Sequence, residues 1–109
     1  MVTRVSDTVV NGHVERQFAQ DVLATSGLDF GINDGLYVEG LSVTSVEANV
    51  LTLADDEINY VYLNTSSMFL ESTTGSFPSA DFVPMFVVTT SAGAIANVDD
   101  VRSRLISSL

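Results

Sequence analysis

The stretch Leu36-Tyr37-Val38-Glu39-Gly40-Leu41-Ser42-Val43-Thr44 consists of two short runs, rich in β-branched and aromatic residues, on either side of a glycine. Runs of this kind around a turn residue are typical of a β-hairpin. Similar runs recur from residue 35 onward, separated by clusters of Gly, Asn, Asp and Ser. The stretch therefore predicts a domain made of consecutive hairpins.

The remaining strands are expected in the second half of the chain. The runs at 49–53 and 58–63 flank the acidic turn Asp55-Asp56-Glu57, so we expect them to pair with each other. Residues 68–71 form a short strand, and 83–90 pair with 94–98 around Ser91-Ala92-Gly93. The expected fold is mainly β: a compact antiparallel β-sandwich or barrel-like domain of at least six strands over residues 27–109. Residues 29–35 are expected to form a turn.

Two strands carry apolar side chains on both faces. In residues 58–63, for example, Ile58, Tyr60 and Tyr62 alternate with Asn59, Val61 and Leu63, and residues 50–53 show the same property. Such strands are usually covered on both sides, by a second sheet or by another subunit. This pattern favours an oligomer.

The first 26 residues have a mixed pattern, unlike the hairpin-rich region after residue 35, and are expected to form an extended N-terminal arm. Val5, Val9 and Val10 could add a strand to the open edge of a neighbouring chain, and Phe18 and Leu23 could then fill partner pockets. Two alternatives to the arm remain open. Disorder is common at chain ends, and the segment also shows a weak helical spacing.

At the other end, residues 99–106 carry acids early and arginines late. Asp99 and Asp100 precede Arg102 and Arg104, an order that suits the helix dipole. We expect a short C-terminal helix here.

The charge balance excludes several kinds of partner. The chain has 14 acidic residues, four Arg and no Lys, for a net charge of −10. Nucleic acid and anionic membranes are poor partners because their binding depends on basic side chains. No apolar run approaches the roughly 20 residues that span a bilayer, and no secretory signal is present. We expect a soluble protein.

No catalytic or cofactor motif is found. His13 is the only histidine and cysteine is absent, so repeated metal-ligand or nucleophile patterns cannot be assembled. Asp55-Asp56-Glu57 could bind a hard cation but is more typical of a solvated turn. Neither a Gly-x-Ser-x-Gly elbow nor a glycine-rich nucleotide loop occurs. We expect no enzyme, no cofactor and no metal.

Aromatic residues are the remaining candidates for a functional surface. Tyr37, Tyr60 and Tyr62 could stack on sugar rings, although cross-strand packing is the more common role. Phe77-Pro78 and Val83-Pro84 bracket a segment expected to be a crossover loop or an edge, from which aromatic rings could insert into a neighbour. The residues expected at a protein interface are Val5, Val9, Val10, Phe18, Leu23, Tyr60, Tyr62, Phe82 and Phe86.

Several short motifs resemble, in order and spacing, a small β module of tailed-bacteriophage virion proteins that is often met inside tail-fibre-like chains. They span residues 27–104 and are Leu51-Thr52-Leu53-Ala54, Asn59-Tyr60-Val61-Tyr62-Leu63, Thr73-Thr74-Gly75, Phe77-Pro78, Val83-Pro84-Met85-Phe86-Val87-Val88-Thr89-Thr90, Ala94-Ile95 and Val98-Asp99-Asp100-Val101-Arg102. Ser76 is an insertion, and Met85-Phe86 replaces a smaller pair. The resemblance implies a structural role, with trimeric packing as a tendency and no catalytic residue.

Because the sequence ends shortly after this module, without a heptad stalk or a receptor-binding head, the expected function is capsid decoration. In this hypothesis a homotrimer on the outer surface of the virion binds the major capsid protein and cements the lattice. A tail or tail-fibre attachment component is the first alternative. A carbohydrate-binding or glycan-degrading protein is the second, and a glycan-degrading enzyme would need an acid pair roughly 5–9.5 Å apart in a cleft.

Overall fold

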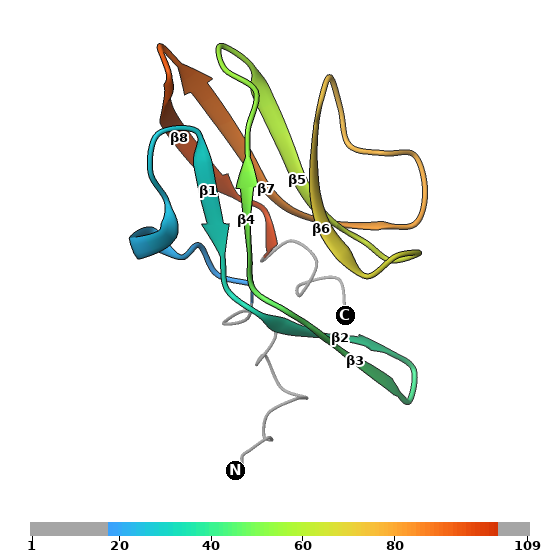
Figure 1. The fold of residues 1–109 in the computed structure, drawn as a ribbon. Helices are drawn as coiled ribbons and strands as arrows, with labels where there is room; N and C mark the ends of the chain where they lie inside the picture. The colour runs from blue at the N-terminus through green and yellow to red at the C-terminus, as the bar shows by residue number, and fades with distance from the viewer. Residues whose placement is uncertain (1–17, 103–109) are drawn as a thin grey trace.

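The computed structural model describes residues 18–102, and the fold within this range is antiparallel β throughout (Figure 1). One short 3-10 turn, η2 (Val22–Ala24), precedes the strands β1 (Asp29–Ile32), β2 (Gly35–Glu39), β3 (Ser42–Val46), β4 (Asn49–Thr52), β5 (Ile58–Asn64), β6 (Phe69–Thr74), β7 (Phe82–Ser91) and β8 (Ala94–Asp100). The prediction of a mainly β, antiparallel domain is confirmed. Residues 29–32 form a strand, so the expected turn at 29–35 is wrong.

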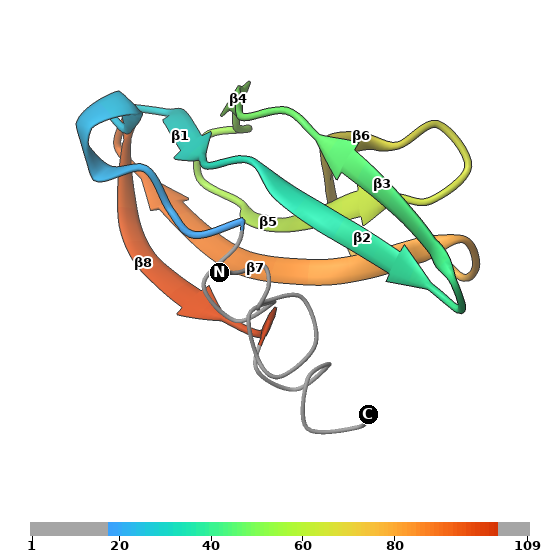
Figure 2. The same cartoon turned by 90° about the horizontal axis from the view of Figure 1, so that it is seen from below.

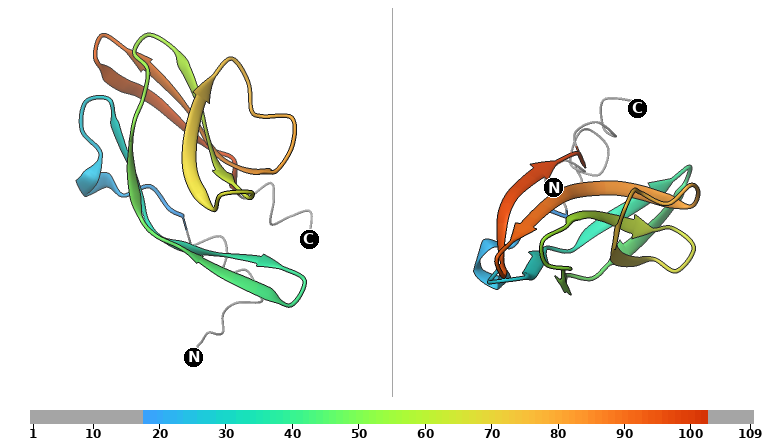
Figure 3. Two further views of the ribbon diagram at one scale, coloured as in Figure 1. Left: turned by 45° about the vertical axis from the view of Figure 1, so that its right-hand side comes forward. Right: turned by 90° about the horizontal axis from the view of Figure 1, so that it is seen from above.

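The first four strands form one long, bent hairpin. β2 pairs with β3 and β1 pairs with β4, and the two ladders are separated by residues 33–34 on one side and 47–48 on the other. Gly40 has φ +62° at the first position of the two-residue turn, the position where hairpin turns of type II′ place glycine. Figure 3 shows that the β2–β3 part projects away from the other strands.

The other four strands form a sheet in the order β6-β5-β7-β8. The expected hairpin of residues 83–90 with 94–98 is confirmed as β7–β8. Pro78 lies in the loop between β6 and β7 as expected, but Pro84 lies inside β7. Proline is tolerated there because the β5–β7 register shifts beside Tyr62, and because the pairing of β8 with β7 starts only at Phe86.

The two parts pack as layers, with β1 and β4 over one face of the four-stranded sheet (Figure 2). Phe30 of β1 and Phe86 of β7 meet edge to face with 5.1 Å between the ring centroids. Around them the buried core is Phe18, Ile32, Val46, Leu53, Val61, Leu63, Leu70, Met85 and Val88. The fold is therefore sandwich-like, and apolar burial between the layers holds it together.

The expected pairing of residues 49–53 with 58–63 is wrong. β4 pairs with β1, whereas β5 lies between β6 and β7. The acidic turn that joins β4 to β5 bonds to the β7–β8 turn instead: Gly93 N–H donates to the Asp55 carboxylate at 2.9 Å and Ala92 N–H to that of Asp56 at 3.1 Å. A central position for β5 satisfies both of its backbone edges, which a lone hairpin partner would not do.

Residues 18–26 belong to the domain rather than to an arm. Phe18 is buried, its N–H donates to Asp34 O at 3.1 Å, and Asp21 N–H donates to Gly31 O at 2.8 Å. A Cβ on Gly35 would lie 2.6 Å from the Phe18 ring, so this segment packs directly against β2. The arm boundary at residue 26 is thus wrong for residues 18–26, and residues 1–17 lie outside the described residues.

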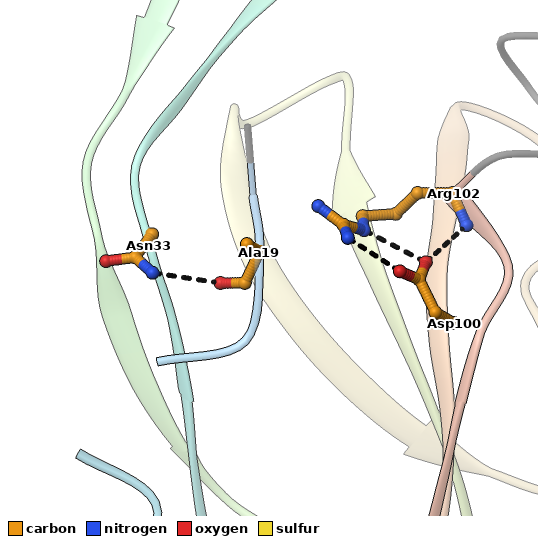
Figure 4. Close-up of polar contacts among 4 residues, drawn as sticks. All are labelled: Ala19, Asn33, Asp100 and Arg102. Atoms are coloured by element: carbon orange, nitrogen blue, oxygen red, sulfur yellow. Dashed lines mark hydrogen bonds and ion pairs between the residues drawn. The ribbon is translucent and has the colours of Figure 1, made fainter. Parts of the chain in front are cut away.

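The expected C-terminal helix is also corrected at its start. Asp99 and Asp100 belong to β8, because the ladder with β7 continues to the pair Phe86–Asp100. Arg102 then bonds back to Asp100, with 2.6 Å between Nη2 and Oδ2 (Figure 4). Residues 103–109, which carry the rest of the expected helix, lie outside the described residues.

Asn59 joins the two layers through its side chain. It is 1% exposed; its amide oxygen accepts from Ala54 N–H at 3.0 Å, and its amide nitrogen donates to Ala54 O at 3.1 Å and to Val88 O at 3.4 Å. Thr90 supports the same turn, because its hydroxyl donates to Ala54 O at 2.6 Å.

We expect Asn59→Ala to lower the free energy of unfolding by roughly 1–2 kcal/mol, since buried polar groups lose their partners. Urea denaturation measures this loss. Asn64→Ala is the control on the same strand, because Asn64 is only partly buried and its hydrogen bonds to Glu71, Ser66 and Ser67 lie nearer to solvent. Equal losses for both variants would contradict the structural role of Asn59.

Candidate protein-binding face

The outer face of the four-stranded sheet, opposite the core, is built around β5. Tyr60 lies between Thr73 of β6 and Val87 of β7, and Tyr62 lies between Glu71 and Pro84. Successive strand residues point to opposite faces, so both tyrosines turn away from the buried side chains Val61 and Leu63. The alternation predicted from the sequence for residues 58–63 is confirmed.

The loop between β6 and β7 places two phenylalanines over these tyrosines. Phe77 meets Tyr60 edge to face at 5.1 Å between centroids and stacks on Phe82 at 5.6 Å. Phe82 in turn lies edge to face with Tyr62 at 6.3 Å. Offset and edge-to-face pairs of this kind add stability beyond the area they bury, so the four rings form one cluster.

Two further apolar side chains extend the cluster toward solvent. Ile58 begins β5 on the same face and is 48% exposed, and Phe69 pairs with Asn64 at the other end of β5 and is 66% exposed. We call Ile58, Tyr60, Tyr62, Phe69, Phe77 and Phe82 the aromatic face. It is an apolar surface that the described part of the chain covers only in part.

Glu71 fixes the polar end of Tyr62. The Tyr62 hydroxyl donates to Glu71 Oε1 at 3.1 Å, and the Asn64 amide donates to the same oxygen at 3.2 Å. Burial, together with the hydrogen bond to the Glu71 carboxylate and its charge, raises the pKa of Tyr62 above its ordinary value of 10.0. The folded state therefore favours the neutral, protonated form of the Tyr62 phenol.

A raised tyrosine pKa stabilises the fold below pH 10.0, the ordinary value, and this contribution is lost as the pH rises through the folded-state pKa. Tyr62→Phe has no proton to lose at this position. We expect the wild-type protein to lose more stability than Tyr62→Phe as the pH rises above 10. Urea denaturation on both sides of this pH measures the difference, and parallel losses would contradict the expectation.

The structure brings together only some of the residues predicted for an interface. Tyr60, Tyr62 and Phe82 share the aromatic face. Phe18 and Phe86 are instead buried in the core of the chain itself, apart from this face, and Tyr62 is also largely buried at 9% exposed. Leu23 is fully exposed in η2, apart from the aromatic face. Val5, Val9 and Val10 lie outside the described residues.

Three members of the aromatic face and one polar neighbour were not predicted: Ile58, Phe69, Phe77 and Glu71. The alternation on residues 58–63 already placed Ile58 on the face of Tyr60, and Phe77 stood in the segment bracketed by prolines. The positions of Phe69 and Glu71 depend on the register of β6 against β5, which local sequence does not reveal.

Two further observations concern metal ions and membranes within residues 18–102. No group of three or more His, Cys, Asp or Glu side chains in this range is placed to hold a metal ion. The same residues include no helix that is long and apolar enough to cross a membrane.

The Asp100 carboxylate accepts hydrogen bonds from Arg102, and this contact holds the pKa of Asp100 below its ordinary value of 3.8. The stability that the Asp100 carboxylate contributes is therefore lost only as the pH falls below that value.

Comparisons with known proteins add no family. No protein-family model matches the chain, and no curated protein matches it significantly.

Proposed function

We propose that this chain is a non-catalytic structural protein that binds another protein chain through the aromatic face. The observation that carries the proposal is the cluster of Tyr60, Phe77 and Phe82, flanked by the exposed side chains of Ile58 and Phe69. Aromatic residues are enriched at protein interfaces, where rings that are partly buried in the free protein become fully desolvated.

The excess of acidic residues indicates which side chains a binding partner would carry. Every acidic residue except Asp7 and Glu15 lies within residues 18–102, and Arg102 is the only basic residue in this range. Glu71 accepts a hydrogen bond from the Tyr62 hydroxyl, and Asp81 directly precedes Phe82 in the chain. A complementary partner has an apolar centre with Lys or Arg around it, because opposite charges at the rim steer association.

In its more specific form, the proposal places the chain on the outer surface of a bacteriophage capsid, where it binds the major capsid protein as a decoration or cement protein. The resemblance to virion β modules over residues 27–104 supports this location. The homotrimer expected from the sequence rests on the resemblance and on the two strands with apolar side chains on both faces. Phe77 and Phe82 of the same chain cover part of the outer side of β5, whereas Val50 of β4 is 47% exposed.

Copy number in purified particles tests the location. Quantitative mass spectrometry of phage particles from cells that make this chain should find hundreds of copies per particle if it decorates the capsid. A dozen or fewer copies would indicate the tail or fibre alternative. A chain that is absent from particles would overturn a virion role, and binding to a glycan array would then favour the carbohydrate-binding alternative.

A further inference from the structure

The outer edge of β3 is open and carries no charge. β3 pairs only with β2, and none of residues 18–102 pairs with its other side. In an antiparallel ladder, successive residues direct their backbone N–H and C=O groups alternately toward the partner strand and away from it. Counted from the two-residue turn, Val43 and Ser45 direct these groups away from β2, toward the open edge. Its sequence, Ser42-Val43-Thr44-Ser45-Val46, lacks the lysine, proline or inward charge that usually protects an edge strand.

This edge is complementary to itself. If two copies of β3 run antiparallel with Thr44 opposite Thr44, Val43 of each copy faces Ser45 of the other, so the outward-pointing backbone groups bond in pairs. Val38 and Val43 already face each other across the hairpin, and the pairing extends this row to Ser45 and Leu36 of the second copy. Thr44 meets its own counterpart, which is a favourable cross-strand pair.

The same register gives the hairpin tip a place to bind. It sets Leu41 of one copy beside Glu47 of the other, and Leu41 is fully exposed in the single chain. Beside Glu47 lies a hollow of about 490 Å³ between residues 45–49 and residues 67–70, and Val46, Met68 and Leu70 are among its apolar lining. The tip of each copy is therefore placed next to Glu47, a residue that lines the hollow of the other copy.

We propose that two copies of this chain associate about a two-fold axis through β3, with each Leu41 occupying the partner's hollow. A second copy fits this edge because β3 is self-complementary in the register above. β3 also carries no charged residue, whereas the chain as a whole has a net charge of −10 and would repel another copy elsewhere. Stable interfaces bury roughly 1,200 Å² or more, and we expect two five-residue edges to bury less. The dimer should therefore form at high concentration and become stronger with salt, which screens the repulsion.

Disulfide trapping tests the register, since the chain has no cysteine of its own. Residues opposite each other at a non-hydrogen-bonded position have Cα atoms about 4.5 Å apart, within the range that a disulfide spans. We expect Thr44→Cys to form a covalent dimer under mild oxidation, and Ser91→Cys, at the exposed end of β7, to form far less. Equal trapping of the two variants, or none, would overturn the proposal.

Sedimentation tests the anchor without a cysteine. The wild-type protein should shift from 11.6 kDa toward twice this mass as its concentration and the salt rise. Leu41→Asp should abolish the shift, and Leu23→Asp, at the other fully exposed leucine within residues 18–102, should leave it intact. A wild-type protein that stays monomeric, or that reaches three times the subunit mass, refutes the two-fold pairing. Circular dichroism confirms that both variants are folded.

The pairing does not depend on the proposed binding to capsid protein. Phe69 of the aromatic face also lines the hollow, whereas Ile58, Tyr60 and Phe82 lie outside the β3 edge and the hollow. A variant at Ile58 therefore tests the aromatic face without changing the dimer contact, and Leu41→Asp tests the dimer without changing a residue of that face.

Discussion

Replacing Phe86 with alanine should lower the free energy of unfolding by about 3–5 kcal/mol. The ring is buried between the two layers, lies edge to face with Phe30, and has the Arg102 guanidinium 5.2 Å from its centroid. Its removal leaves a cavity that both layers border. Because a domain of this size has a total stability of about 5–15 kcal/mol, the variant should be close to unfolding in mild urea.

Phe69→Ala is the matched control, because this ring is 66% exposed on the outer face. Its loss should stay within about 1 kcal/mol. Similar midpoints of urea denaturation for Phe86→Ala and Phe69→Ala would contradict the layered core described above.

Phe18→Ala should also cost about 3–5 kcal/mol in the isolated protein. Phe18 is buried against β2, so its ring belongs to the core that the single chain forms. If residues 18–26 were part of a binding arm, the same substitution would leave the melting transition unchanged and weaken only attachment to a partner. Thermal denaturation followed by circular dichroism distinguishes the two, with Leu23→Ala as the exposed control for which no loss is expected.

Local patterns in the sequence were sufficient for the hairpins whose turns are short. The β2–β3 and β7–β8 hairpins follow from glycine-containing turns between β-branched runs, and both are confirmed. The pairing of β1 with β4 is different, because Phe30 faces Leu51 across 20 intervening residues. Nothing in residues 29–32 alone, which include a glycine and an aspartate, distinguishes a strand from a turn.

The site was predicted in part for the same reason. The alternation in β5 places Tyr60 and Tyr62 on one face, which a sequence can show. Which side of a strand is core depends on long-range packing, so Phe86 could not be distinguished from Phe82 as a buried ring. The contact of Phe77 with Tyr60 depends on the path of the loop between β6 and β7, and loop paths carry little periodic signal.

The most direct test of the proposed protein-binding role compares Ile58→Arg with Val50→Arg. The two side chains are 48% and 47% exposed, both lie on strands, and both substitutions change the net charge equally, but only Ile58 lies on the aromatic face. Retention on purified particles, or on isolated capsomers, is measured for each variant after its fold is confirmed by circular dichroism. The account predicts that Ile58→Arg loses at least tenfold in retention, because the new charge is buried against a basic partner, and that Val50→Arg binds like the wild-type protein. Equal retention of the two variants would contradict it.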